Sequence, residues 1–144
     1  MTNKNSIVSI RNFSSSIEKV YQAWANPNYL IEWWGPAGFS NTFHKHDLVP
    51  GGQWSFIMHG PNGIDYPNEC IFIDIKPNEY LSWHHLPNPK FEVNTFFEVI
   101  DENSTQVTFK MIFDTEKEAE SLRSFILEKN EENFVKLDAV LQNI

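Results

Sequence analysis

The sequence predicts an α+β domain in which one curved antiparallel sheet of about seven strands wraps around a long C-terminal helix. Apolar residues recur at helical spacing near the start of the chain and again after residue 115. Between residues 39 and 113 this spacing is lost, and turns rich in Gly, Pro or Asn recur about every ten residues, as in an antiparallel meander. The length of 144 residues fits a single domain, 1–144, with a self-sufficient core.

The N-terminal part is expected to contain one strand followed by two short helices. A β-branched run over residues 7–13 predicts the strand. Ser16 then offers a helix N-cap, and apolar residues recur at helical spacing up to Asn26-Pro27, where the first helix should end. A second helix over residues 28–34 is closed by Gly35-Pro36.

The middle of the chain is expected to form six strands, each bounded by a turn-forming segment. They cover residues 39–48, 53–59, 66–75, 80–86, 91–100 and 105–113. Alternation along four of these strands assigns one set of side chains to the concave face. This set is Trp54, Phe56, Met58, Leu81, Trp83, His85, Val93, Thr95, Phe97, Val99, Val107, Phe109, Met111 and Phe113. The strand around Cys70 is apolar on both faces, so its alternation does not decide which side faces the core.

The C-terminal part, from Thr115 onward, is expected to form a long helix that closes the concave face. Its apolar stripe consists of Ala119, Leu122, Phe125, Ile126, Phe134, Leu137, Val140 and Leu141. We expect Leu122, Phe125 or Ile126 to contact the sheet at Phe97, Phe109 and Met111. A polar run over residues 128–133 interrupts the stripe and would allow a kink or a turn there.

Charge and composition exclude several classes of function. The chain has 11 Lys and Arg against 19 Asp and Glu, a net charge of −8 that repels nucleic acid and anionic lipid. No apolar run approaches the roughly 20 residues that span a bilayer. The single cysteine cannot form an internal disulfide, and the first fifteen residues are polar, so we expect a cytoplasmic protein.

Two pairs of histidines are candidate functional sites. His44 and His46 should share one strand face, but no third ligand accompanies them, so we expect no metal and no other cofactor. His84 and His85 are neighbours in a strand and should point to opposite faces, with His85 inside and His84 outside. Asn68 lies inside a strand, where an amide is disfavoured, so turn chemistry and pocket polarity are both open for it.

Several short motifs add a family resemblance to this pattern. They are Val20, Ala23 and Trp24; Pro27, Leu30 and Trp33-Trp34-Gly35-Pro36; Asp47-Leu48 with Pro50-Gly51-Gly52; Met58-His59-Gly60-Pro61-Asn62-Gly63; Asp65-Tyr66-Pro67-Asn68; and Ile75-Lys76-Pro77 with Leu81 and His85. Together they resemble the SRPBCC (START/Bet v-like) superfamily and, within it, the branch related to activators of the heat-shock protein 90 ATPase. The resemblance implies a helix-grip fold with a deep apolar cavity, which relatives use for hydrophobic small molecules. It implies no single activity.

Three functional hypotheses follow. The leading one is a module that binds an apolar or aromatic small molecule between the sheet and the C-terminal helix. The expected ligand-binding residues are Trp54, Phe56, Met58, Asn68, Trp83, His85, Phe97, Phe109, Met111 and Phe125. The alternative is a co-chaperone that stimulates a heat-shock protein 90 ATPase, with a chaperone as partner. A cyclase- or hydrolase-like enzyme with His85 as acid or base comes last, because no second catalytic group accompanies it.

Overall fold

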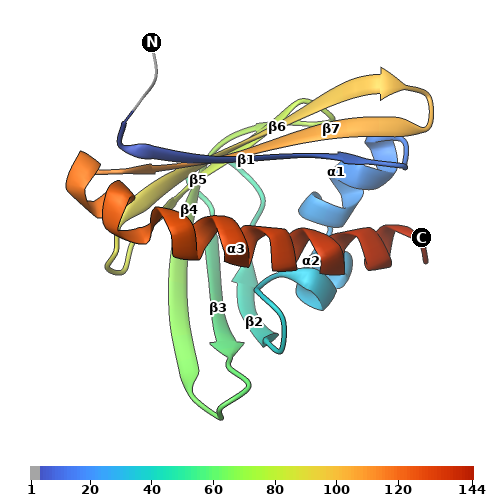
Figure 1. Ribbon diagram of the computed structural model, residues 1–144. Helices are drawn as coiled ribbons and strands as arrows, with labels where there is room; N and C mark the ends of the chain where they lie inside the picture. Colours follow the sequence, from blue (N-terminus) through green and yellow to red (C-terminus); the bar gives the residue numbers. More distant parts are fainter. Residues whose placement is uncertain (1–3) are drawn as a thin grey trace.

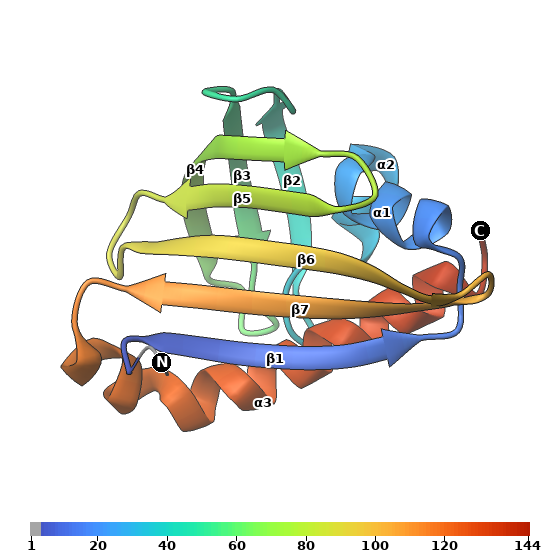
Figure 2. The same ribbon diagram turned by 90° about the horizontal axis from the view of Figure 1, so that it is seen from above.

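The computed structural model describes residues 4–144 and contains one seven-stranded antiparallel sheet with three helices (Figure 1). The elements in chain order are β1 (Ser6–Phe13), α1 (Ile17–Ala25), α2 (Pro27–Trp33), β2 (Ser40–His46), β3 (Gln53–His59), β4 (Asp65–Lys76), β5 (Tyr80–His85), β6 (Phe91–Asp101), β7 (Ser104–Phe113) and α3 (Glu116–Leu141). The strand order is β1-β7-β6-β5-β4-β3-β2, so the first strand pairs with the last and the others follow as a meander (Figure 2). The predicted fold class is confirmed.

The two short helices begin and end at the residues that their capping chemistry favours. The Ser16 side chain caps α1 by accepting a hydrogen bond from the Lys19 amide at 3.4 Å. Asn26 ends α1 and also caps α2, because its side chain accepts from the Asn28 amide at 3.0 Å. Pro27 occupies the first turn of α2, where its missing N–H costs nothing.

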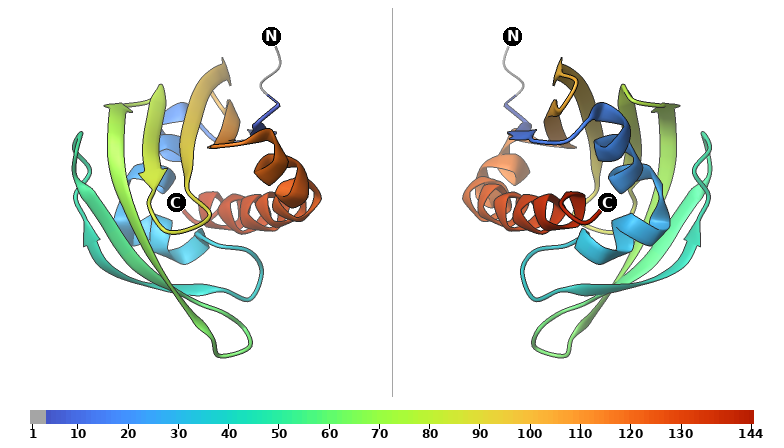
Figure 3. Two further views of the ribbon diagram at one scale, coloured as in Figure 1. Left: turned by 90° about the vertical axis from the view of Figure 1, so that its left-hand side faces the viewer. Right: turned by 90° about the vertical axis from the view of Figure 1, so that its right-hand side faces the viewer.

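The sheet is strongly curved, and all three helices lie on its concave side (Figure 3). α3 packs against β1 and β7 and against both short helices. Its main anchor is Phe134, whose ring meets Phe13 of β1 edge-on at a centroid distance of 5.9 Å and Phe109 of β7 at 6.3 Å. The polar run over residues 128–133 does not break the helix, which is continuous from Glu116 to Leu141.

Burial confirms most of the predicted facing. Every member of the predicted concave set on β7 is buried, as are Leu81 and Trp83 on β5. On β4, which the pattern left open, Cys70 and Phe72 point inward. Val99 is the exception: it is 61% exposed and lies beyond Phe96, where the pairing of β6 with β5 ends.

The prediction for the first histidine pair is wrong. A β-bulge interrupts the pairing of β2 with β3, where Phe43 lies opposite Phe56 and Lys45 lies opposite Ser55. The extra residue, His44, is exposed, while the half-buried His46 stacks against the ring of Phe43. The bulge therefore shifts the alternation by one residue, and the two histidines do not share a face. Among residues 4–144, no group of three metal-binding side chains exists.

Candidate functional site

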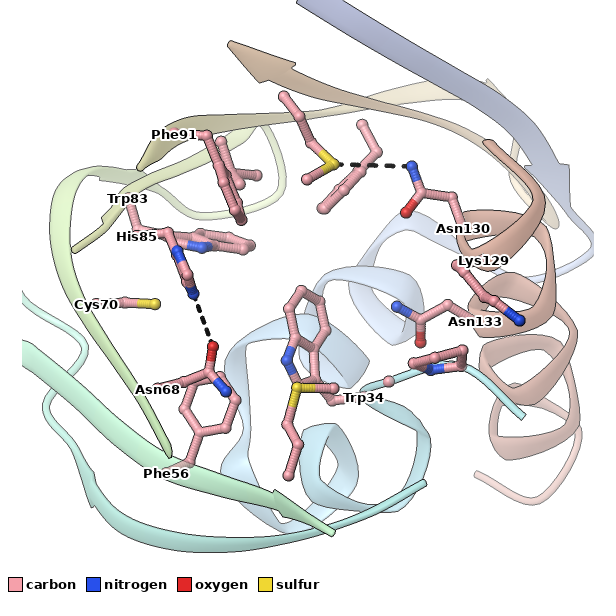
Figure 4. A pocket seen from close by; sticks show the side chains of 16 residues that line it. Trp34, Phe56, Asn68, Cys70, Trp83, His85, Phe91, Lys129, Asn130 and Asn133 are labelled. Carbon is pink, nitrogen blue, oxygen red and sulfur yellow. Dashed lines mark hydrogen bonds between the residues drawn. The ribbon is translucent and has the colours of Figure 1, made fainter. Parts of the chain in front are cut away.

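A cavity of about 140 Å³ lies between the concave face of the sheet and α3 (Figure 4). It is lined by Trp34, Gly35, Pro36, Phe56, Met58, Asn68, Cys70, Trp83, His85, Phe91, Val93, Phe109, Met111, Lys129, Asn130 and Asn133. The sheet therefore supplies a mostly apolar and aromatic wall, whereas α3 supplies a polar one.

Trp34 forms the inner end of the cavity. Its ring contacts Trp54 at a centroid distance of 5.1 Å and Trp83 at 5.9 Å, and it also meets Phe109. The side chain of Asn41 on β2 donates to the Trp34 carbonyl oxygen at 2.7 Å and holds this part of the chain in place. Trp33, by contrast, is fully buried and donates from its indole nitrogen to the Ala23 carbonyl oxygen at 2.9 Å. The two neighbouring tryptophans thus have different structural roles: Trp33 fixes α2 to α1, and Trp34 faces the cavity.

The predicted ligand-binding residues fall into three groups. Those that line the cavity are Phe56, Met58, Asn68, Trp83, His85, Phe109 and Met111. Trp54 and Phe97 are buried in the core behind that wall, where Trp54 stacks on Phe56 and Phe97 contacts Trp24. Phe125 lies outside the cavity and is 59% exposed.

An outer groove of about 470 Å³ adjoins the cavity. It is lined by Pro36, Phe39, Met58, Tyr66, Asn68, Pro89, Phe125 and Lys129. Four of these, Pro36, Met58, Asn68 and Lys129, also line the cavity, so the two spaces meet at this neck. Phe125 therefore belongs to the approach to the cavity and not to its inner wall.

The α3 wall is tied to the loop between α2 and β2. Lys136 donates from its ammonium group to the carbonyl oxygens of Gly35 at 3.1 Å, Pro36 at 3.3 Å and Phe39 at 3.1 Å. Glu132 accepts from the Ala37 amide at 3.1 Å. Since Gly35 and Pro36 line the cavity, these contacts hold the helix wall and the loop wall together.

The second histidine pair is split as predicted, with His84 exposed and His85 half-buried in the cavity wall. The His85 ring stacks on Phe91 at 4.4 Å, and its Nδ1 lies 3.1 Å from the Pro89 carbonyl oxygen. A carbonyl oxygen can only accept, so Nδ1 bonds to it only when this nitrogen carries a proton. The other nitrogen, Nε2, lies 2.7 Å from Oδ1 of Asn68, whose Nδ2 donates to the Tyr66 carbonyl oxygen at 2.9 Å.

Burial sets the protonation of His85. It lowers the pKa of His85 below its ordinary value of 6.5, while the carbonyl oxygens of Pro89 and Pro87 act in the opposite direction. The neutral ring carries one N–H, which can bond either to the Pro89 carbonyl oxygen or to Asn68 Oδ1, whereas the protonated ring bonds to both. In each case the partners of His85 come from the protein itself.

We expect this lowered pKa to make stability depend on pH. The unfolded His85 takes up a proton at a higher pH than the folded one, so the free energy of unfolding should fall as the pH drops through the ordinary histidine pKa. His46, whose pKa burial also lowers, contributes in the same direction. Denaturation of His85→Gln between about pH 5 and pH 8 should show a smaller proton uptake on unfolding than the parent, by a fraction of one proton. An unchanged pH dependence would contradict this account of His85.

Cys70 is not a nucleophile. Its side chain is buried, and desolvation, with a smaller contribution from the charge of Glu69, raises the pKa of the thiol to about 12. A thiol with such a pKa is protonated at neutral pH, and thiolate is the reactive form. Cys70 therefore contributes only shape and apolar surface to the cavity.

The α3 wall contains two asparagines that the sequence pattern did not identify as site residues. Asn130 and Asn133 are both buried, at 8% and 9% exposure. Asn130 donates to Ser9 Oγ at 3.1 Å and lies 3.9 Å from the Met111 sulfur. The available signal was their spacing, because positions 130 and 133 continue the apolar stripe that runs through Ile126, Phe134 and Leu137.

A second histidine site lies on the opposite face of the sheet. His59 Nε2 lies 2.7 Å from Thr42 Oγ1, and His59 Nδ1 lies 2.7 Å from Asp65 Oδ1. This hydroxyl, imidazole and carboxylate chain joins β2, β3 and β4 on the outer surface, where Thr42 and Asp65 are exposed and His59 is half-buried. It does not face the cavity.

The comparisons with known proteins agree with this architecture. The family described as "Activator of Hsp90 ATPase homolog 1-like protein" matches residues 14–142. A protein from Arthrobacter aurescens solved by NMR is 23% identical with a TM-score of 0.89, over 100% of this chain and 91% of its own. A crystal structure from Nitrosomonas europaea is 18% identical with a TM-score of 0.90, over 99% and 97%. A protein from Mycobacterium smegmatis is 20% identical with a TM-score of 0.85, over 97% and 92%.

These likenesses to solved structures show the fold, and no functionally curated protein matches the sequence. Across residues 4–144, no helix is long and apolar enough to cross a membrane. The family match extends over both short helices, β2 to β7 and α3, which is nearly the whole chain. The chain therefore belongs to the family of proteins similar to activator of Hsp90 ATPase homolog 1, with the SRPBCC fold.

Proposed function

We propose that the protein binds an aromatic small molecule in the cavity between the sheet and α3. The observation that carries this proposal is the cavity itself, whose sheet side presents Phe56, Trp83, Phe91 and Phe109 and whose inner end is Trp34. Aromatic and aliphatic walls with a few polar groups are typical of small-molecule sites. The cavity also meets an apolar groove, which provides a route for the ligand.

The dimensions limit the ligand. A dry cavity of about 150 Å³ engineered in another protein accepts one benzene ring, so one ring should fit inside and any further part should lie in the groove. At about 25 cal/mol per Å² of apolar surface removed from water, a ligand that buries about 300 Å² gains about 7 kcal/mol before association costs. Dissociation constants no tighter than micromolar are therefore expected.

The proposal is tested by closing the neck between the groove and the cavity. Met58 lies at this neck and is half-buried at the end of β3, so Met58→Trp should block the passage with little strain on the core. The probe is N-phenyl-1-naphthylamine, a neutral two-part aromatic whose fluorescence rises in apolar surroundings. The parent should bind it in a saturable manner, and Met58→Trp should weaken binding at least tenfold.

Val99→Trp is the matched control, because it adds the same side chain at a strand end that is 61% exposed and lies outside the cavity. It should bind the probe like the parent. Equal binding by all three proteins would show that the probe sits elsewhere, and absence of saturable binding by the parent would contradict the proposed function.

The family name supports a second candidate, stimulation of an Hsp90 ATPase. This function needs no ligand in the cavity and would depend on the outer surface. An ATPase assay with a purified Hsp90 separates the two: stimulation that is the same for the parent and for Met58→Trp would support the co-chaperone.

A further inference from the structure

The polar side chains that line the cavity differ in whether they have hydrogen-bond partners. His85 and Asn68 lie within hydrogen-bond distance of each other and of backbone carbonyl oxygens, and Asn130 donates to Ser9. Among the described residues that line the cavity, Asn133 alone has a buried side-chain atom, Oδ1, without a hydrogen-bond partner. A buried amide without hydrogen bonds destabilises a protein, so an asparagine at this place needs another explanation.

The position of Asn133 points to a ligand. Asn133 is only 9% exposed, and its amide nitrogen is on the side that faces the cavity in Figure 4. The terminal torsion of asparagine is soft, so a small rotation brings the carbonyl oxygen toward the cavity as well. A carboxamide that presents both atoms along one edge can donate one hydrogen bond and accept another from the same partner.

Charge on the ligand is disfavoured by the surroundings. The cavity surface opposite Asn133 is apolar and aromatic, and burying an ionised group there would cost far more than burying a neutral one. Lys129, the cation among the described residues that line the cavity, already pairs with Glu132 at 3.3 Å and lies 5.4 Å from the Phe125 ring centroid. A neutral ligand that offers an acceptor and a donor side by side suits these groups best.

We propose that the ligand is a neutral aromatic molecule that carries an N–H group next to a carbonyl oxygen, as in an aromatic carboxamide or lactam. Its ring lies among Trp34, Trp83 and Phe109, and its amide pairs with both ends of the Asn133 carboxamide. This assignment rests on the proposed function of the cavity and makes Asn133 the residue that determines specificity.

Three compounds of nearly the same shape test the pairing one hydrogen bond at a time. Benzamide has the donor and the acceptor, acetophenone keeps the carbonyl oxygen but replaces the NH₂ with a methyl group, and α-methylstyrene has neither. Their affinities are measured by competition with N-phenyl-1-naphthylamine for the parent and for Asn133→Leu. The ratio between the two proteins cancels the different costs of removing each compound from water.

Asn133→Leu is expected to weaken the binding of benzamide at least tenfold and to weaken that of acetophenone less. The binding of α-methylstyrene should be unchanged or tighter. Its thermal midpoint should equal or exceed that of the parent, because the change removes an unpaired amide. Asn143→Leu is the control, since that asparagine is exposed and its side chain donates to the Ala139 carbonyl oxygen, outside the cavity. If the leucine variant is poorly folded, Asn133→Ala, which removes the amide without adding bulk, should show the same order of losses.

Failure of the Asn133 assignment and failure of the proposed ligand-binding function give different results. If N-phenyl-1-naphthylamine binds but Asn133→Leu weakens all three compounds equally, or none of them competes, the assignment of Asn133 is overturned while the ligand-binding cavity stands. If the parent binds neither the probe nor any of the three compounds, both fail together.

Discussion

Replacing Phe134 by alanine is expected to lower the free energy of unfolding by about 3–5 kcal/mol. Phe134 is the aromatic anchor of α3, only 1% exposed, and its ring meets both Phe13 and Phe109 edge-on. Its loss would leave a cavity between the helix and the sheet, and the surrounding side chains would fill this cavity only in part. Urea denaturation of the parent and the variant, analysed with a common slope, measures the difference.

Phe125→Ala provides the matched control on the same helix. Phe125 is 59% exposed and contacts the Lys129 side chain, so its removal should cost less than about 1 kcal/mol. Similar losses for the two variants, or a larger one for Phe125, would mean that α3 is rotated relative to the sheet and that Asn133 does not face the cavity.

Trp34→Ala is expected to change stability and binding in opposite directions. The Trp34 ring is half-buried and contacts five aromatic side chains, Trp24, Trp33, Trp54, Trp83 and Phe109. Its loss should lower the free energy of unfolding by about 3 kcal/mol, at the low end for a core tryptophan. It should also enlarge the cavity, so the variant should admit two-ring ligands that the parent accommodates only partly in the groove.

The measurement compares thermal shifts produced by naphthalene and by benzene, since a ligand that binds only the folded state raises the midpoint. Trp34→Ala should favour naphthalene over benzene more strongly than the parent does, and Trp34→Phe should lie between them. If the alanine variant loses stability without any change in this preference, Trp34 is a core residue and not the inner end of a ligand cavity.

The sheet could be predicted from the sequence because alternation of side chains is a strong local signal. The inward positions of Trp83 and His85, and of all predicted residues on β7, follow from the two-residue period alone. The α2 boundary could also be anticipated, because Asn26-Pro27 combines a capping side chain with a residue suited to the first turn.

The bulge in β2 could not be predicted. The sequence around His44 alternates no differently from a regular strand, and the bulge is visible only once β2 is paired with β3. The facing of β4 was open for a related reason, since both of its faces are apolar and the helices alone determine which face is covered.

The helix wall of the site was the part that the pattern missed. Leu122 and Ile126 pack against the buried core as expected, whereas Phe125 is exposed. Asn130, near Met111, and Phe134, near Phe109, add contacts with the sheet that the pattern did not predict. The polar run over residues 128–133 has the pattern of an interruption, yet two of its asparagines, Asn130 and Asn133, are buried on the inner face of α3. Hydrophobic periodicity cannot identify such residues. In the sequence, a polar residue that faces a cavity looks the same as a residue at which the apolar stripe of the helix is interrupted.

The proposed function requires that an aromatic ring enters the cavity between the sheet and α3. The most direct measurement is a crystal structure of the protein soaked with bromobenzene, in which anomalous scattering locates the bromine atom without reference to the shape of the density. The account predicts a bromine peak inside the cavity bounded by Trp34, Trp83 and Phe109. Bromine peaks confined to the outer surface, with the cavity filled by rearranged side chains, would contradict it.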